Sequence, residues 1–303
     1  MTERSSIVDN ILQLKDERQA LILVHNYQRP EIQDIADFLG DSLELSRKAA
    51  AADPPVIVFC GVRFMAETAK ILSPGKTVLL PRLDAGCPMA GMADAETLRR
   101  MKAAHPEATV VTYVNSTAEV KAESDVCVTS ANALQIVQKL DAKEILFLPD
   151  RNLAAYVQRF TDKKIIPWPG FCYVHEQFGS GEVLDARRNH PGAVLLVHPE
   201  CRPEVIDLAD ETLSTSGMLK FVRESASKTF IIGTEEGILH RMQAENPGKT
   251  FLALGSVKTC VNMKKTRLED LHRALLYGRH EIVLPKGLMD RARIALEKML
   301  SYA

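Results

Sequence analysis

Short apolar runs alternate with amphipathic stretches along most of the chain. The runs LILV (21–24), VIVF (56–59), EILFL (144–148) and AVLLV (193–197) are rich in Val, Ile and Leu and are continuous rather than alternating. Continuous runs of this length are typical of strands that are buried on both faces of a sheet. Because helical stretches separate the runs, the pattern predicts an α/β fold with parallel sheets.

The same pattern occurs three times. Segments 21–37, 110–125 and 195–210 align without gaps over their first turn, and counting starts at His25, Tyr113 and His198. Each copy then has Glu at +6, Ile or Val at +7, Asp at +12 and a small hydroxyl residue at +17. These are Glu31, Glu119 and Glu204; Ile32, Val120 and Val205; Asp37, Asp125 and Asp210; and Ser42, Ser130 and Thr215. So many shared offsets predict an internal repeat.

The pattern of each copy predicts a strand, helix, short strand, helix, strand, helix and strand, in that order. We therefore expect three homologous three-layer αβα units with parallel sheets, arranged about a pseudo-threefold axis. The expected units are residues 1–85, 86–171 and 172–266. Residues 267–303, with helices expected over 267–277 and 287–302, should pack back on the first unit.

Polar residues follow the first strand of each copy. In open α/β sheets, ligands bind beyond the carboxyl ends of the strands. A threefold arrangement would bring the +0 and +2 side chains to one central pocket. These are His25, Tyr113 and His198, with Tyr27, Asn115 and Glu200. The alternative is that they only cap strand ends, but their repetition favours a pocket.

The +17 hydroxyl residues stand where helices are expected to begin. Ser42, Ser130 and the pair Ser214–Thr215 are each predicted at a helix N-cap. A helix N-terminus also offers free N–H groups and a positive dipole end to an anion. Three such ends at one pocket would suit a small ligand with several carboxylates or a phosphate.

The chain has six cysteines, at positions 60, 87, 127, 172, 201 and 260, and they form no CxxC motif. Cys87, Cys172 and Cys260 occupy equivalent loop positions in the three copies, so we expect them to meet at one metal site. Cys60 and Cys127 are interpreted as small buried hydrophobic residues, and the role of Cys201 stays undecided. Three thiolates can hold zinc with one open position, or a cubane iron–sulfur cluster with one bare iron. Either would offer a Lewis acid suited to dehydration chemistry.

Composition narrows the class of protein. Lys and Arg number 38 against 39 Asp and Glu, which argues against a nucleic-acid or anionic-membrane surface. No apolar run reaches the roughly 18 residues of a membrane span. Residues 1–20 predict an amphipathic helix rather than a signal peptide, so we expect a cytoplasmic protein with reduced thiols and no disulfide framework.

Several motifs together resemble one known family, quinolinate synthase. They are HNYQRPEIQDIADFLGDSLELS, VRFMAETAKIL, DAGCPMA, TYVNSTAEVKA, TSANA, VHPEC, GTEEGILHR and CVNMKK, between about residue 20 and residue 265. The resemblance implies a threefold α/β assembly around a [4Fe–4S] cluster held by Cys87, Cys172 and Cys260, with the fourth iron open to substrate. Many members have Pro where this chain has Val261, which changes the stiffness of the loop rather than the ligand.

The resemblance also implies a reaction. Iminoaspartate would condense with dihydroxyacetone phosphate, losing phosphate and two waters, to give quinolinate for NAD biosynthesis. Tyr27, His198 and Glu200 would be the acid/base candidates, with His25 and Tyr113 positioning groups or sharing protons. The implied substrate pocket comprises His25, Tyr27, Ser42, Tyr113, Asn115, Ser130, His198, Glu200, Ser214 and Thr215.

The implied partners are small molecules, with a functional link to an L-aspartate oxidase, and neither nucleic acid nor membrane. Two other functions fit the same thiols. An iron–sulfur hydro-lyase would use an open iron without forming a carbon–carbon bond. An iron–sulfur sensor would need a partner- or DNA-binding surface, which the balanced charge disfavours.

Overall fold

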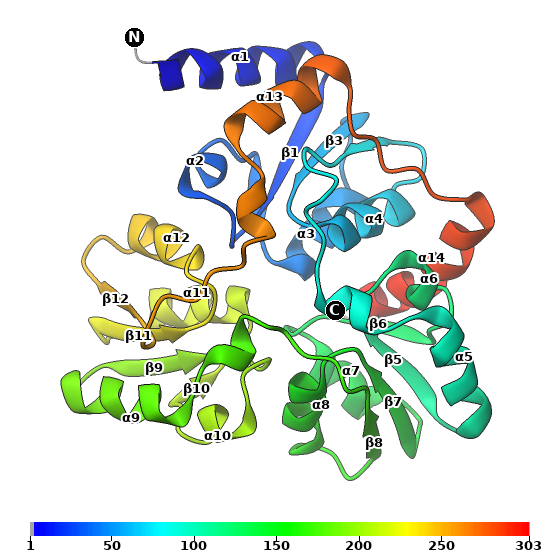
Figure 1. Cartoon of the computed structure of the whole chain (residues 1–303), viewed down its shortest axis with the longest axis vertical. Helices are drawn as coiled ribbons and strands as arrows, with labels where there is room; N and C mark the ends of the chain where they lie inside the picture. The colour runs from blue at the N-terminus through cyan, green and yellow to red at the C-terminus, as the bar shows by residue number, and fades with distance from the viewer. Residues whose placement is uncertain (1–2, 303) are drawn as a thin grey trace.

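Three four-stranded parallel sheets form the frame of the molecule in the computed structural model, which describes residues 3–302 (Figure 1). The sheets have the orders β2-β1-β3-β4, β6-β5-β7-β8 and β10-β9-β11-β12. We call them, with their helices, the first, second and third unit. The strands are β1 (Ala20–His25), β2 (Phe38–Gly40), β3 (Val56–Cys60), β4 (Thr77–Leu79), β5 (Thr109–Tyr113), β6 (Val126–Val128), β7 (Glu144–Leu148), β8 (Lys164–Pro167), β9 (Val194–Val197), β10 (Glu211–Thr212), β11 (Thr229–Gly233) and β12 (Thr250–Ala253).

Helices connect the strands of each sheet, as parallel strands require. In the first unit they are α2 (Pro30–Gln33), α3 (Ser42–Ala50) and α4 (Arg63–Leu72). The second unit has α6 (Ala118–Lys121), α7 (Ala133–Lys139) and α8 (Arg151–Gln158), and the third has α10 (Pro203–Ile206), α11 (Thr215–Glu224) and α12 (Ile238–Glu245). The expected strand and helix order of each copy, and the α/β fold of three units with parallel sheets, are therefore confirmed.

The central strands are buried on both faces, which explains why their sequences are continuously apolar. In β1, Ile22 and Val24 pack with α1 (Glu3–Glu17), whereas Leu23 packs with α3 and α4 on the opposite face. Successive side chains of a strand point to opposite faces, so a two-sided core needs an apolar residue at every position. In β9, likewise, Leu195 and Leu196 belong to the cores on opposite faces of the third sheet. The units are three-layer sandwiches.

A helix that follows each expected metal-site cysteine covers the next sheet along the chain. After Cys87, α5 (Ala95–Ala104) packs on the second sheet through Leu98, and after Cys172, α9 (Ser180–Asn189) packs on the third through Val183. After Cys260, α13 (Leu268–Tyr277) returns to the first sheet, where Leu271 joins the core beside α1. The three units are thus linked in a closed ring (Figure 1).

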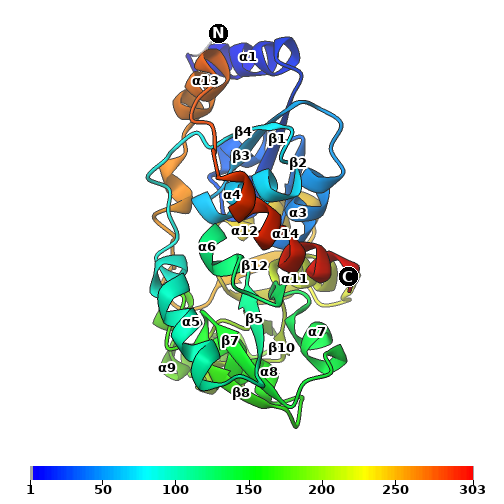
Figure 2. The same ribbon diagram turned by 90° about the vertical axis from the view of Figure 1, so that its right-hand side faces the viewer.

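The last helix, α14 (Lys286–Ser301), lies across two units. It packs against α4 of the first unit and against α6 and β6 of the second, and Figure 2 shows it along their boundary. Its residues Ala292, Ala295, Leu296 and Met299 are buried. Helix α13 packs on the first unit, whereas α14 is shared between the first and second units. None of the helices within residues 3–302 has the length and apolar character to span a membrane.

The aspartate at +12 has the same structural role in every unit. The carboxylates of Asp37, Asp125 and Asp210 accept the backbone N–H groups of Ile22, Val110 and Leu195 at 2.8, 2.7 and 2.7 Å. Each aspartate donates its own N–H to the carbonyl of the same residue. The side chain thereby extends the pairing of a central strand beyond its very short neighbour. This recurring residue is structural, because an unpaired strand N–H would be costly.

Candidate active site and metal centre

The three units meet at the carboxyl ends of their strands and line one shared cavity. Nearly all of the residues predicted from the repeat line it. These are His25, Tyr27, Ser42, Tyr113, Asn115, Ser130, His198, Glu200 and Thr215, together with Cys87, Cys172 and Cys260. Ser214 is not among the lining residues; its hydroxyl instead accepts the N–H of Gly217 at 3.2 Å.

Two of the three predicted helix caps are wrong. The cap of α3 is Asp41, whose carboxylate accepts the N–H groups of Leu43 and Glu44 at 2.9 Å, so Ser42 is the first helical residue. Helix α7 is capped at Asn132, two residues after Ser130. Ser214 does cap α11. Ser42 and Ser130 are consequently not tied to a cap, and both line the cavity.

The two strand-end histidines share one geometry. Nδ1 of His25 accepts the N–H of Tyr27 at 3.1 Å, and Nδ1 of His198 accepts the N–H of Glu200 at 3.3 Å. Burial lowers the pKa of each imidazole to about 3. Both rings are therefore neutral near pH 7. Because Nδ1 accepts, the proton is on Nε2, and each ring is a hydrogen-bond donor at that atom.

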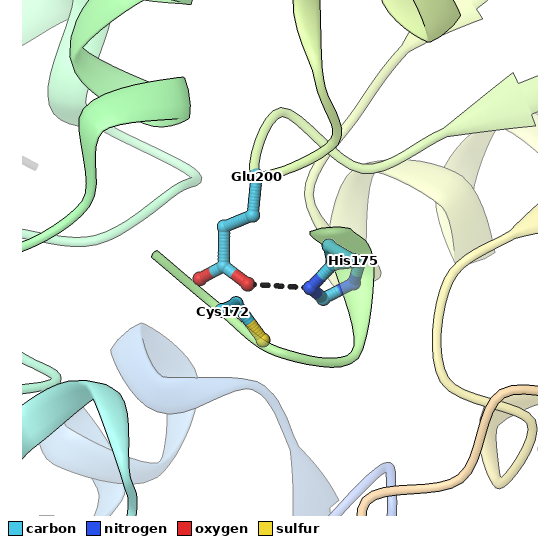
Figure 3. A group of neighbouring side chains, drawn as sticks. All are labelled: Cys172, His175 and Glu200. Carbon is cyan, nitrogen blue, oxygen red and sulfur yellow. Dashed lines mark ion pairs between the residues drawn. The ribbon is translucent and has the colours of Figure 1, made fainter. Parts of the chain in front are cut away.

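Two residues that the repeat did not nominate, His175 and Thr234, connect the predicted ones. The hydroxyl of Tyr27 lies 2.6 Å from Oγ1 of Thr234, which lies 2.8 Å from Nε2 of His175. Nδ1 of His175 lies 2.6 Å from Oε2 of Glu200, without the alignment of a well-formed hydrogen bond (Figure 3). The His175 ring also stacks on His198, with centroids 4.5 Å apart.

The electrostatics of this network differ at its two ends. Burial raises the pKa of Tyr27 well above its ordinary value, so its phenol stays protonated. Burial also opposes ionisation of Glu200, but His198, His175 and a hydrogen bond from Tyr113 outweigh it and lower the pKa of Glu200. The network therefore runs from a phenol to a carboxylate.

Equivalent backbone contacts hold the three cysteine loops. In each unit, the residue three positions after the end of the third strand donates its backbone N–H to the carbonyl of the residue two positions before the cysteine. The pairs are Arg63 and Ala85 at 2.8 Å, Arg151 and Gly170 at 2.8 Å, and Glu236 and Lys258 at 3.1 Å. In two units a buried carboxylate adds a contact to the cysteine itself. Cys172 donates its N–H to Asp150 at 3.1 Å, and Cys260 donates to Glu235 at 2.9 Å.

Each of these three sulfurs also accepts a backbone N–H from the residue three positions later, namely Ala90, His175 or Met263. These donors favour a thiolate, and they belong to the short helices η1 (Met89–Met92), η2 (His175–Gln177) and η3 (Met263–Lys265). Burial has the larger effect, however, and raises the pKa of all three thiols, that of Cys87 to about 12. Loss of the thiol protons therefore has to accompany the binding of a cation.

The spacing of the three sulfurs bears on which metal group they could hold. Tetrahedral zinc would set two sulfur ligands about 3.8 Å apart. Among residues 3–302, the three sulfurs do not all lie within 4.8 Å of one another. A cluster separates its ligands further, because several irons stand between them, so the residues fit a cluster better than one zinc ion. Cys60, Cys127 and Cys201 are free and fully buried, and they do not line the cavity.

A cavity with acid/base side chains and a thiol triad, built where three α/β units meet, defines an enzyme active site. The chain belongs to the family described as quinolinate synthetase A protein, which it matches over residues 9–301. Its relatives include the quinolinate synthase of Methanoregula boonei, 55% identical over 301 residues, or 99% of this chain and 100% of the relative. The quinolinate synthase of Desulforudis audaxviator is 54% identical over 97% of this chain and 98% of the relative, and quinolinate synthase 1 of Methanosarcina acetivorans is 50% identical over 99% and 98%.

Proposed function

We propose that this chain is a quinolinate synthase, which condenses iminoaspartate with dihydroxyacetone phosphate and releases phosphate and two waters. The observation that carries the proposal is the shared cavity, in which the thiols of Cys87, Cys172 and Cys260 line the same space as the polar side chains of all three units. The family and its relatives named quinolinate synthase, at 50% identity or more over nearly the full length, support it.

Cys87, Cys172 and Cys260 would hold a [4Fe–4S] cluster. Such a cluster with three protein ligands supplies an open iron that acts as a Lewis acid toward a substrate oxygen. The chain contributes the three sulfurs, the N–H groups that favour their thiolate forms, and the carboxylates of Asp150 and Glu235 that fix two of the loops.

The polar side chains would bind and orient two anionic substrates. Ser42, Ser130 and Thr215 offer hydroxyl donors from the three units, and the amide of Asn115 offers another. His25 and His198 would donate from Nε2 while staying neutral, so they orient carbonyl or carboxylate oxygens without adding a charge. Burial excludes water, which strengthens each of these contacts.

Tyr27 would be the group that exchanges a proton with substrate. When Tyr27 takes a proton from substrate, its own phenolic proton passes to Thr234, and the hydroxyl proton of Thr234 passes to Nε2 of His175, over contacts of 2.6 and 2.8 Å. The imidazolium formed would be balanced by the Glu200 carboxylate 2.6 Å away. Tyr27 would therefore act as acid or base, and Glu200 as the charge that makes this possible. Tyr113, hydrogen-bonded to Glu200, would position that carboxylate.

The direct test supplies the iron-loaded chain with dihydroxyacetone phosphate and with iminoaspartate made in place by an L-aspartate oxidase. We expect quinolinate, detected by chromatography and mass spectrometry, at an equimolar amount to the phosphate released. A cluster-loaded enzyme that releases no quinolinate would contradict the proposal and favour the hydro-lyase. Running the assay with the oxidase across a dialysis membrane also tests whether the functional link needs contact between the two enzymes.

A cytoplasmic location and unit limits at 1–85, 86–171 and 172–266 stay predictions. All six cysteines are free thiols, as a reducing compartment would leave them. Fractionation of cells, followed by immunodetection of the chain, would test the location. Limited proteolysis would test the limits, since cleavage is expected in the loops near residues 85 and 171.

A further inference from the structure

We propose that the chain, when its cysteines hold no cluster, binds one divalent transition-metal ion through Cys172, His175 and Glu200. The ligand atoms are the sulfur of Cys172, Nδ1 of His175 and a carboxylate oxygen of Glu200, and all lie within 4.8 Å of one another (Figure 3). The side chains come from the loop after β8, from η2 and from the loop after β9. His175 and Glu200 are 1% and 3% exposed, and Cys172 is half-buried.

The distances match those that a single ion needs. Zinc with one sulfur and one nitrogen ligand holds these two atoms about 3.5 Å apart. The ligand atoms lie within 4.8 Å of one another, so the sulfur and the nitrogen need to approach by at most about 1.3 Å to reach this spacing. The 2.6 Å between His175 Nδ1 and Glu200 Oε2 must widen slightly as the ion enters between them. No aligned hydrogen bond opposes this movement, because Nδ1 has none.

The surroundings of His175 resemble those of a ligating histidine. A metal-bound imidazole usually donates its second N–H to an oxygen, which fixes the ring. Here Nε2 lies 2.8 Å from Oγ1 of Thr234. Because the Thr234 hydroxyl can either donate or accept, the ring can move its proton to Nε2 and leave Nδ1 free for the ion. The hydroxyl of Tyr27, 2.6 Å from Oγ1 of Thr234, can hold the Thr234 hydroxyl in place either as donor or as acceptor.

The ligand set indicates the class of metal. One thiolate, one imidazole and one carboxylate suit zinc and its usual substitute, cobalt(II), rather than magnesium or calcium. Three protein ligands leave one position that opens to the cavity. Since the site uses Cys172, it excludes the cluster of the proposed function, and zinc would therefore block cluster assembly. This exclusion rests on that proposed function, whereas binding of the ion does not.

The test titrates the full chain, prepared anaerobically and freed of metal with a chelator, with Co²⁺ and then with Zn²⁺ as competitor. We expect one Co²⁺ per chain and a sulfur-to-cobalt charge-transfer band. The double variant C87S/C260S should keep both, because neither cysteine is a ligand. C172S should lose the band, and H175Q should lose affinity by more than about a hundredfold. T234V should weaken binding by about tenfold, as expected for a group that orients a ligand.

Loss of the ion in C87S/C260S would overturn the proposal, since the three cysteines would then be the site. The absence of binding to the cluster-free parent would overturn it as well. Circular dichroism of each variant separates lost ligands from lost folding, and T234V keeps the test open should H175Q fail to fold. These readouts involve neither iron nor quinolinate, so failure of the proposed function would leave them unchanged.

Discussion

The hydroxyl of Tyr27 lies 2.6 Å from Oγ1 of Thr234, across the boundary between the first and third units. Tyr27 follows the first strand of one sheet, and Thr234 follows the third strand of another. The contact that links two candidate catalytic groups is therefore also one that fixes how two units sit relative to each other. The geometry of the site thus depends on the packing of the units.

Removing this hydroxyl should slow the chemical step. We expect Tyr27→Phe to lower kcat by about 10²–10⁴-fold, because the proton path through Thr234 loses its first member. KM should change much less, since the ring still fills its place. Tyr156→Phe, at a tyrosine that packs on Phe160 in the second unit, is the matched control and should keep full activity. Equal losses in both variants would show that the hydroxyl of Tyr27 has no special role.

The cysteines that line the cavity should differ from those buried in the sheets. Alanine at position 87, 172 or 260 should abolish assembly of the four-iron cluster, because each supplies one of the three sulfurs that line the cavity. Cys60→Ala and Cys127→Ala should retain the iron of the parent, since both residues are buried in the sheets. Iron and sulfide analysis after anaerobic purification measures the difference. About four irons per chain in the parent would agree with the proposed cluster, whereas iron lost from Cys60→Ala would contradict the assignment.

The buried histidines should make the chain sensitive to acid. The pKa of His25 and of His198 is about 3 in the folded chain against an ordinary 6.5, so between these values the unfolded chain binds more protons. The free energy of unfolding should then fall as pH drops below about 6.5, by up to roughly 1.4 kcal/mol per pH unit for each histidine. Urea unfolding at pH 7, 6 and 5 measures the slope. His198→Gln should reduce it, and His190→Gln, at an exposed histidine, should not.

The recurring aspartates should matter for stability and not for chemistry. Asp125→Ala leaves the N–H of Val110 without its 2.7 Å acceptor, which should lower the free energy of unfolding by about 1–3 kcal/mol. Asp141→Ala, at an exposed aspartate of the same unit, is the control and should change it by less than about 0.5 kcal/mol. A fall in kcat without a fall in stability would contradict the structural role of Asp125.

The repeat predicted most of the fold because repetition is itself a physical signal. Apolar runs define strands that are buried on both faces, and shared offsets indicate which loops are equivalent. The helix starts were harder, because Asp41 and Ser42 are adjacent and both side chains can cap. In the structure the carboxylate of Asp41 accepts two N–H groups and Ser42 is left for the cavity. Local sequence alone does not decide between two such neighbours.

His175 and Thr234 were missed for a different reason. His175 stands three residues after Cys172, where the other units have Ala90 and Met263. Thr234 likewise corresponds to Gly61 and Pro149. A search for recurring polar positions cannot find residues that occur once, yet a substrate without threefold symmetry needs such residues. The spacing from Cys172 to His175 was the available signal, since both side chains reach the same cavity.

Each cysteine loop is followed by a helix that covers the next sheet, and this arrangement affects how the chain unfolds. Leu98, Val183 and Leu271 each complete the core of a sheet from a neighbouring part of the ring. Unfolding of one sheet together with its cysteine loop would displace the helix that covers the next sheet and expose an apolar face, at a cost of about 25 cal/mol for each Å². The three units should therefore melt in a single cooperative transition, despite a sequence that divides so readily into thirds.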